Sequence, residues 1–426
     1  WKFSDRTSVE SDVKLNDIRT WDLKRIAKKV IFHYRMSLEN SNISQNKSLT
    51  DFKEIIHQTE DVKDFRSTLY DFLGHTAIAF FTTNSFNIPG PAQTFTISER
   101  KYFSNDTYFL NMDVSTTDSL NTKYYAVMGY KLLTDFHLRH KNRTAQLMLE
   151  LDRLKFANQH STLSNKSELY YNALQRLTVQ YKSNTHVAEV WHLIAQVHYE
   201  KGNLYSFPSE ENRWEKKTAY NICKETINKF PDTHGAKQCE SLMNSINQKE
   251  FSFTAENVMT PNKKNKFLLN YKNFDKLYVK IINYPIKKFE NDKYKTIVKN
   301  LRTGEGIHKN EITFELPGDF QKHNIEYLIP ELAIGHYVIV ASSSPEFKET
   351  KHAFAYHPFW VTNISYQTLS KDNEGKVLVT NRTTGEPING AKVGVHYSKY
   401  NYTTRKYDTK TIGHYNTDEN GLAKFT

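Results

Sequence analysis

The spacing of apolar residues changes near residue 250, from the period of helices to the alternation of β-strands. Before that point, apolar residues recur at three- and four-residue intervals and form one face of each predicted helix. The clearest case is the first helix, where Trp21, Leu23 and Ile26 begin such a stripe. The pattern predicts helices at 21–38, 50–73, 122–139, 143–158, 167–181, 186–200, 216–230 and 234–247, with an irregular connection over 84–120.

After residue 250 the apolar residues alternate with polar ones in short runs. Phe251 and Phe253 begin the series, and Val338 and Val340 continue it, with Asn, Gly, Pro and Lys between the runs. Such runs are typical of antiparallel strands. We therefore expect a β-sandwich over 251–361 and a second over 362–426. About 65 residues is short for a sandwich, so whether the second is truncated stays open.

The last four predicted helices are expected to pair into two hairpins. Small residues recur at corresponding positions 48 residues apart, with Ala188 in the first hairpin and Ala236 in the second. The repeat is longer than the roughly 34 residues of a tetratricopeptide repeat, because a loop at 205–213 is inserted. Two such units resemble a short tetratricopeptide-like solenoid, and an ordinary helical bundle is the alternative. The predicted domains are 1–165, a helical N-terminal region; 166–250, the tetratricopeptide-like hairpins; and the two sandwiches.

The charge and hydropathy of the chain limit the kinds of partner that it is expected to bind. The 426 residues include 58 Lys and Arg against 47 Asp and Glu, a net charge of +11. The basic residues are scattered among Asn, Tyr and Asp, which indicates a solvated surface, so no nucleic-acid partner is expected. No apolar run approaches the length that spans a bilayer. The chain begins at Trp1 rather than Met, and we expect it to be part of a longer protein whose targeting segment was removed.

The sequence contains none of the common enzyme motifs. The chain has no His-Glu-x-x-His, Cys-x-x-Cys, Walker A or Gly-x-Ser-x-Gly pattern. His137 and His140 could share a helix face, but a histidine pair without a carboxylate is usually a packing feature. We therefore expect a non-enzymatic protein with no cofactor and no metal.

The two cysteines form the first candidate site. Cys223 and Cys239 fall on predicted helices joined at Pro231, and an antiparallel pairing would bring them to the same height. Two interpretations stay open. One is a disulfide formed in an oxidising compartment, and the other is a pair of buried free thiols that pack as small hydrophobic residues.

The second candidate site is an aromatic loop inserted between the hairpins. Most of the Tyr and Phe residues fall on predicted apolar faces and belong to the core. Tyr205, Phe207 and Trp214 lie in or beside the inserted loop instead. Exposed aromatic residues on a helical repeat are a candidate partner contact.

Two turn motifs mark the last module. Thr-Gly-Glu-Pro-Ile-Asn-Gly-Ala at 384–391 follows a strand in which Val377 and Val379 alternate with polar residues. Thr-Asp-Glu-Asn-Gly at 417–421 precedes a further strand, and its glycine tolerates positive φ. The two stretches predict one β-sandwich module. They contain no converging ionisable groups.

A resemblance to a known family rests on four features: the helical front, the segments 328–340 and 359–366, and the turn at 384–391. Together they resemble the N-terminal part of a bacterial alpha-2-macroglobulin-like protein, in the long, Asn- and Lys-rich form of Bacteroidetes. The turn motifs also occur in carboxypeptidase-regulatory-like sandwiches, so they indicate fold better than function. The resemblance implies macroglobulin-like sandwiches in a cell-envelope protein of the periplasm or outer membrane. Such proteins are usually anchored by an upstream lipid.

The resemblance also implies a function for the full-length protein, which would trap proteases after they cleave a bait segment. Some members capture the protease through a Cys-Gly-Glu-Gln thioester, but neither Cys223 nor Cys239 stands in that sequence. Proteases, and other envelope proteins, are the partners that this implies. The alternative is a surface adhesion or nutrient-uptake module, in which the helical repeats contact glycan or protein and the sandwiches act as spacers.

Overall fold

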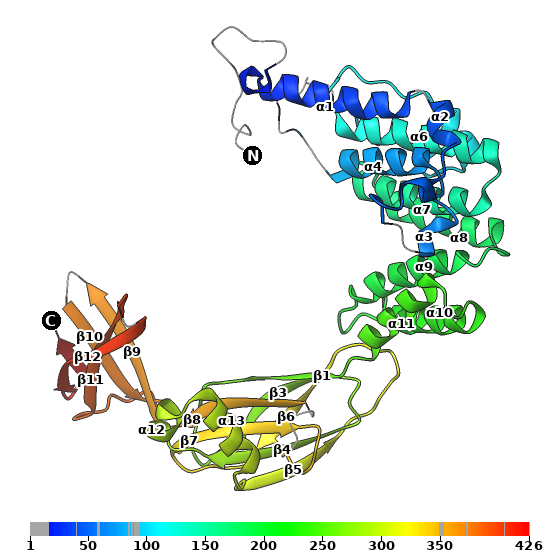
Figure 1. Cartoon of the computed structure of the whole chain (residues 1–426). Coiled ribbons are helices and arrows are strands. Elements are labelled where there is room, and N and C mark those ends of the chain that lie inside the picture. The colour runs from blue at the N-terminus through cyan, green and yellow to red at the C-terminus, as the bar shows by residue number, and fades with distance from the viewer. Residues whose placement is uncertain are drawn as a thin grey trace. The chain divides into compact units, whose positions relative to one another are not determined.

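A computed structural model describes residues 17–39, 41–57, 60–83, 86, 88, 94–348, 353–371, 374–403 and 405–425. The chain divides into two compact units, Trp1–Ile246 and Asn247–Thr426 (Figure 1). The last helix of the first unit ends at Asn247, and the first strand begins at Glu250. The predicted change from helices to strands near residue 250 is therefore confirmed. The finer domain limits at 165 and 361 stay predictions.

The described part of the first unit is helical. Its α-helices are α1 (Leu23–Leu38), α2 (Ser41–Gln45), α3 (Glu60–Lys63), α4 (Leu69–Thr83), α5 (Asp106–Leu110), α6 (Thr122–His140), α7 (Arg143–His160), α8 (Lys166–Gln180), α9 (Val187–Gly202), α10 (Glu215–Lys229) and α11 (His234–Asn247). Short 3₁₀ helices lie at Ile18–Thr20, Leu49–Phe52 and Arg100–Phe103. One hydrophobic core runs through this unit, from Ile31 of α1 to Phe230 at the end of α10. No helix of the described chain is both long and apolar enough to cross a membrane.

The prediction of one helix over 50–73 was wrong. The structure has the 3₁₀ helix at Leu49–Phe52 and the short α3, and α4 begins only at Leu69. Thr68 and Asp71 form a reciprocal cap there: the Asp71 backbone N–H donates to the Thr68 hydroxyl, and the Thr68 N–H and hydroxyl both donate to Asp71 Oδ2. Such a cap starts a new helix where the apolar spacing alone suggests continuity.

The connection predicted as irregular over 84–120 contains Arg100–Phe103 and α5. Residues 84–85, 87 and 89–93 of it lie outside the described part of the chain.

The described residues of the second unit include thirteen strands. They are β1 (Glu250–Ala255), β2 (Val258–Met259), β3 (Asn265–Lys272), β4 (Lys276–Asn283), β5 (His308–Thr313), β6 (His323–Ile329), β7 (Gly335–Ser342), β8 (Phe354–Val361), β9 (Ile364–Lys371), β10 (Glu374–Asn381), β11 (Lys392–Asn401), β12 (Lys406–Asn416) and β13 (Leu422–Phe425). They form the sheets β1-β3-β6, β2-β8-β7-β4-β5, β13-β10-β9 and β11-β12. All pairs are antiparallel except β2 with β8.

The first two sheets enclose one core and confirm antiparallel β structure over 251–361. Phe267 and Leu269 of β3 pack with Leu277 and Val279 of β4 inside it. The alternation of apolar residues did not predict the two helices between β4 and β5, which are α12 (Ile286–Asn291) and α13 (Tyr294–Thr303). They matter because they bury the other face of the larger sheet.

The strand β7 shows the effect of these helices. Ile339 packs into the core between the sheets, whereas Val338 and Val340 pack with Ile297 and Leu301 of α13. Both faces of β7 are therefore buried, which explains its nearly continuous apolar sequence.

Candidate functional site

The loop between α9 and α10 carries the exposed aromatic residues predicted as a partner contact. Phe207 is 81% exposed and Trp214 44% exposed, and Leu204 beside them is 73% exposed. Tyr205 is half-buried. The structure thus places two of the three predicted aromatic side chains in solvent, together with an apolar residue that the prediction did not include.

Basic side chains flank the indole of Trp214. The Arg213 guanidinium lies 5.3 Å and the Lys217 ammonium 5.1 Å from its ring centroid. Arg213 also forms an ion pair with Glu210 at 2.8 Å. Apolar surface bordered by cations suits a partner that offers apolar and acidic groups.

The two cysteines are buried free thiols. Their side chains hydrogen-bond to each other, which raises the pKa of Cys223 and lowers the pKa of Cys239. The predicted proximity of the two residues is therefore present. The disulfide itself stays a prediction.

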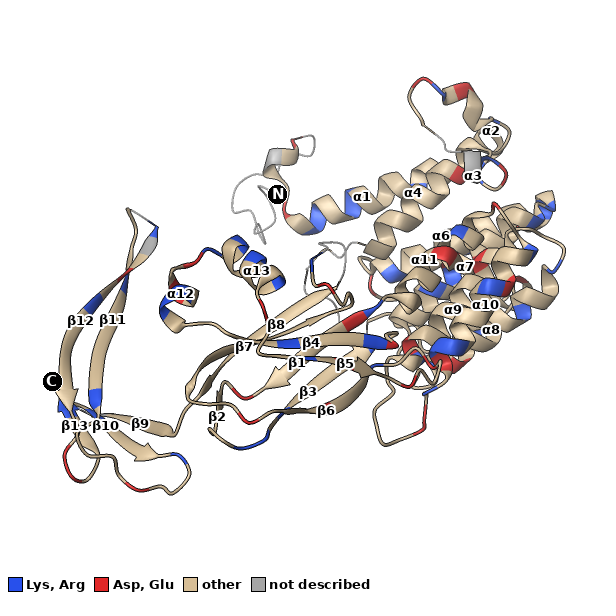
Figure 2. Ribbon diagram, turned by 90° about the horizontal axis from the view of Figure 1, so that it is seen from below, with Lys and Arg blue, Asp and Glu red and all other residues tan. Residues whose placement is uncertain are grey.

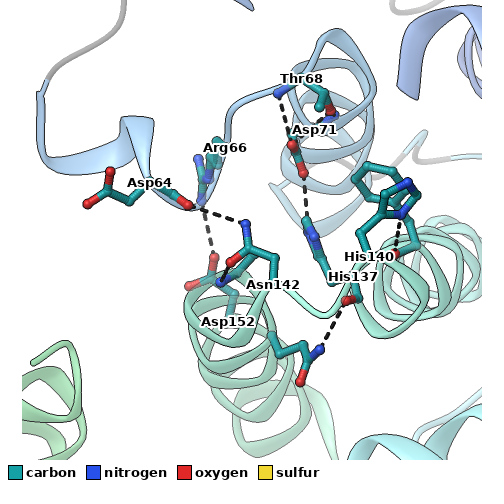
Figure 3. Close-up of polar contacts among 11 residues, drawn as sticks. Asp64, Arg66, Thr68, Asp71, His137, His140, Asn142 and Asp152 are labelled. Atoms are coloured by element: carbon teal, nitrogen blue, oxygen red, sulfur yellow. Dashed lines mark hydrogen bonds and ion pairs between the residues drawn. The ribbon is translucent and has the colours of Figure 1, made fainter. Parts of the chain in front are cut away.

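A buried polar cluster joins α4 to α6 (Figure 3). Asp71 and His137 are each 2% exposed, and Asp71 Oδ1 lies 3.1 Å from His137 Nε2. That distance suits an ion pair, but the contact lacks hydrogen-bond geometry, and neither atom has another partner. Burial on its own raises the pKa of Asp71, but contacts with His137 and Thr68 outweigh it and lower the pKa overall.

His75 completes this cluster. It follows Asp71 by one helical turn on α4 and is half-buried. Burial and then the charge of Arg66 lower the pKa of His75 to about 3. One ligand atom from each of Asp71, His75 and His137 lies within 4.8 Å of the others.

Two glycines let α4 and α6 approach closely enough to form the cluster. A Cβ at Gly74 would lie 2.7 Å from Leu133 Cδ2, and one at Gly129 would lie 2.8 Å from Ile78 Cγ1. Each helix therefore offers a glycine to an aliphatic side chain of the other. The pairs 74 with 133 and 78 with 129 run in opposite directions, and that register continues to Asp71 opposite His137.

His137 and His140 were predicted to be a packing feature, as a histidine pair without a carboxylate usually is. The structure separates them, because His140 Nδ1 contacts the carbonyl of Phe136 and its side chain lies away from Asp71. The carboxylate comes from α4, about 65 residues away in sequence, which local spacing cannot reveal. An Asp-x-x-x-His pattern at 71–75 was the only available signal.

A buried ionic network anchors α7 to the connection before α5. The Arg153 guanidinium donates to the carbonyls of Tyr102 and Ser104 at 2.7 and 2.8 Å and to Glu150 at 3.1 Å. Asp106 lies 3.5 Å from the same guanidinium. Burial and the nearby Glu150 charge raise the pKa of Asp106 to about 7. The network satisfies buried groups of the irregular connection, so its role is structural.

The two turn motifs of the last module meet at one corner. The Thr417 hydroxyl donates to the Ile388 carbonyl at 2.6 Å and accepts from the Ala391 N–H at 2.8 Å. The Thr417 N–H donates to the Ala391 carbonyl, and its own carbonyl accepts from Gly390. These bonds, which we call the Thr417 corner, confirm that the two stretches belong to one β module.

Similarity between this chain and known proteins is confined to solved structures. No family model matches the chain. No curated protein matches it either. Solved structures similar to it include two fragments of native alpha-2-macroglobulin from Escherichia coli. For the fragment spanning domains MG0-NIE-MG1, identity is 13%, coverage is 42% of this chain and 57% of that chain, and the TM-score is 0.28.

For the fragment spanning domains NIE-MG1, identity is 11%, coverage is 42% of this chain and 86% of that chain, and the TM-score is 0.27. Domains 1–6 of the surface layer protein SbsC are also similar, with 10% identity, coverage of 91% of this chain and 56% of that chain, and a TM-score of 0.16. At these identities and TM-scores, the likenesses establish neither a family nor a function.

Proposed function

We propose that this chain is a non-enzymatic scaffold from the N-terminal part of an alpha-2-macroglobulin-like protein of the bacterial cell envelope, of the Bacteroidetes type. The observation that carries the proposal is the Thr417 corner. It joins the turn at 384–391, one of the segments that carry the resemblance, to the turn at 417–421 within one module. That module directly follows another unit of packed antiparallel sheets, as successive macroglobulin-like sandwiches would.

In this proposal the helices α8–α11 form tetratricopeptide-like hairpins, and the full-length protein inhibits proteases by trapping them. The bait segment, any thioester and a lipid anchor would belong to parts of that protein other than residues 1–426. The chain itself supplies rigid spacing and contacts to other envelope proteins. Proteases are the partners of the whole protein, and nucleic acid is not a partner.

The test uses the full-length protein. It is incubated with a serine protease, and the products are separated by native and denaturing electrophoresis. We expect cleavage at a bait segment, together with protease that co-migrates with the cleaved protein and retains activity on small substrates. A protein that is neither cut at one segment nor retains protease would overturn the proposal. Protease inactivated with an active-site inhibitor is the control, because it cannot trigger trapping.

A second candidate, a surface binding or uptake module, is favoured by the loop between α9 and α10. Phe207 and Trp214 of this loop are exposed although the unit has a large core. Binding of the chain to arrayed glycans and envelope peptides tests this function. The double variant Phe207→Ser/Trp214→Ala should lose binding, whereas Tyr294→Ala, which removes an aromatic side chain that is 69% exposed outside the loop, should keep it. Equal binding by both variants would exclude the loop as the contact.

Figure 2 bears on both candidates. Basic and acidic residues are interspersed along the helices and strands of the two units. A mixed surface of this kind favours contacts built on shape and apolar groups over contacts built on net charge.

A further inference from the structure

We propose that Asp71, His75 and His137 bind one first-row divalent cation, for which Zn²⁺ is the best fit. The donor set is one carboxylate and two imidazoles. Hydrolytic zinc sites use the same set of two histidines and one carboxylate, and they keep a further position open. Two of the three ligands are nitrogen atoms, so cations that prefer oxygen ligands fit the set less well.

The first supporting observation is the unsatisfied pair in the core. Asp71 Oδ1 and His137 Nε2 are both buried and lie 3.1 Å apart without forming a hydrogen bond. Buried polar atoms that form no hydrogen bond are rare in folded proteins, and each one calls for an explanation. A cation bound between these two atoms would satisfy both at once.

The second observation is that Asp71 is held in place by its other oxygen. The Thr68 N–H donates to Oδ2 at 3.1 Å, and the Thr68 hydroxyl donates to it at 2.8 Å. Such outer contacts fix the orientation of metal ligands and raise affinity. They leave Oδ1 as the free oxygen, and Oδ1 is the one that faces His137.

The third observation is the rigidity of the framework. Asp71 and His75 are four residues apart on α4, so they occupy the same face. His137 comes from α6, which the glycine contacts at Gly74 and Gly129 hold against α4. Ligands that project from packed helices keep their geometry better than ligands on loops.

Access and charge are compatible with an ion. His75 is half-buried and connects the buried pair to the surface. Ligand atoms within 4.8 Å of one another must close by about an ångström to reach Zn–N distances near 2.0 Å. Arg66 is the neighbouring cation that would oppose binding, but it forms an ion pair with Asp152 at 3.3 Å.

The test is a zinc titration of chain stripped with EDTA and freed of any affinity tag. Competition with a chromophoric chelator measures stoichiometry and affinity. We expect one tight site per chain in the wild type, and a loss of affinity of at least tenfold in His75→Gln. His140→Gln is the matched control, because it removes a histidine of the neighbouring helical turn that lies outside the cluster. It should keep the tight site.

His75 is the residue replaced in this test, because replacing the buried Asp71 or His137 could prevent folding. A second readout needs no variant: Zn²⁺ should raise the thermal midpoint of the wild type, and EDTA should reverse the rise. Equal zinc binding by the wild type and His75→Gln would overturn the proposal. So would an equal loss in His140→Gln, or a midpoint that zinc does not change. Protease trapping can fail without affecting any of these outcomes.

Discussion

Replacing Thr417 by valine tests whether the Thr417 corner holds the last module together. Valine keeps the shape of threonine and removes only the hydroxyl. Thr417 is 4% exposed, so water cannot readily replace the lost bonds. The Ile388 carbonyl would lose its donor and the Ala391 N–H would lose its acceptor. Each unsatisfied buried group costs roughly 1–3 kcal/mol, and we expect a total of about 2–4 kcal/mol because both groups are only partly buried.

Thr417→Ser is the matched control. Serine keeps both hydrogen bonds and loses one methyl group, which costs about 0.8 kcal/mol or less. The difference between the two variants therefore isolates the hydroxyl from the packing of the side chain.

Amide hydrogen exchange measured by mass spectrometry is the appropriate assay, because a global unfolding curve would mix the two units. The N–H of Val379 donates to Gly421 and the N–H of Ile388 donates to Val379, so both report opening of the corner. A loss of 2–4 kcal/mol should speed their exchange by about 30- to 1,000-fold, since each 1.4 kcal/mol corresponds to a factor of ten. Exchange in Thr417→Val that is no faster than in Thr417→Ser would refute the reasoning.

Three further predictions concern the helical unit. Gly235→Ala should lower the free energy of unfolding by about 1–3 kcal/mol, because its Cβ would lie 2.3 Å from a backbone carbon of α9. Urea unfolding followed by the helical circular dichroism signal, which comes mainly from this unit, should show a smaller loss for Gly129→Ala, whose Cβ meets a side chain; an equal loss would contradict this. The pKa of Asp106 is raised to about 7, above its unfolded value, so the folded state binds the proton more tightly than the unfolded state does. Stability should therefore fall as pH rises from about 4 to 7. Asp106→Asn should flatten this dependence, measured as urea midpoints across that pH range. Mild oxidation should join Cys223 and Cys239, and thiol titration of the oxidised, unfolded chain would contradict this by finding two free groups.

The parts of the fold that follow from local periodicity were predicted well. The helices α6, α7 and α8 begin and end within two residues of the expected limits, because their apolar spacing is uninterrupted, and asparagine side chains cap the first turns of α6 and α7. The start of α4 was missed, because it depends on the reciprocal cap between Thr68 and Asp71 rather than on hydrophobic spacing.

Contacts between segments that are distant in the sequence could not be predicted from local spacing. Val338 and Val340 were correctly read as strand residues, but nothing in their spacing says that α13 covers them. Likewise, the exposed loop could be proposed from the positions of Phe207 and Trp214, since an insertion between helices has no core to enter. The contact between His137 and Asp71 could not be predicted from the sequence, because it exists only through the packing of α4 on α6.

Buried polar groups explain why the irregular segments of this chain are nevertheless defined. The connection before α5 offers two carbonyls that no helix or sheet satisfies, and Arg153 reaches both of them from α7. A buried guanidinium requires compensating carboxylates, and Glu150 and Asp106 supply them. The last module solves the same problem with one hydroxyl, that of Thr417. In both units a single polar side chain therefore fixes a loop whose path its own sequence does not determine.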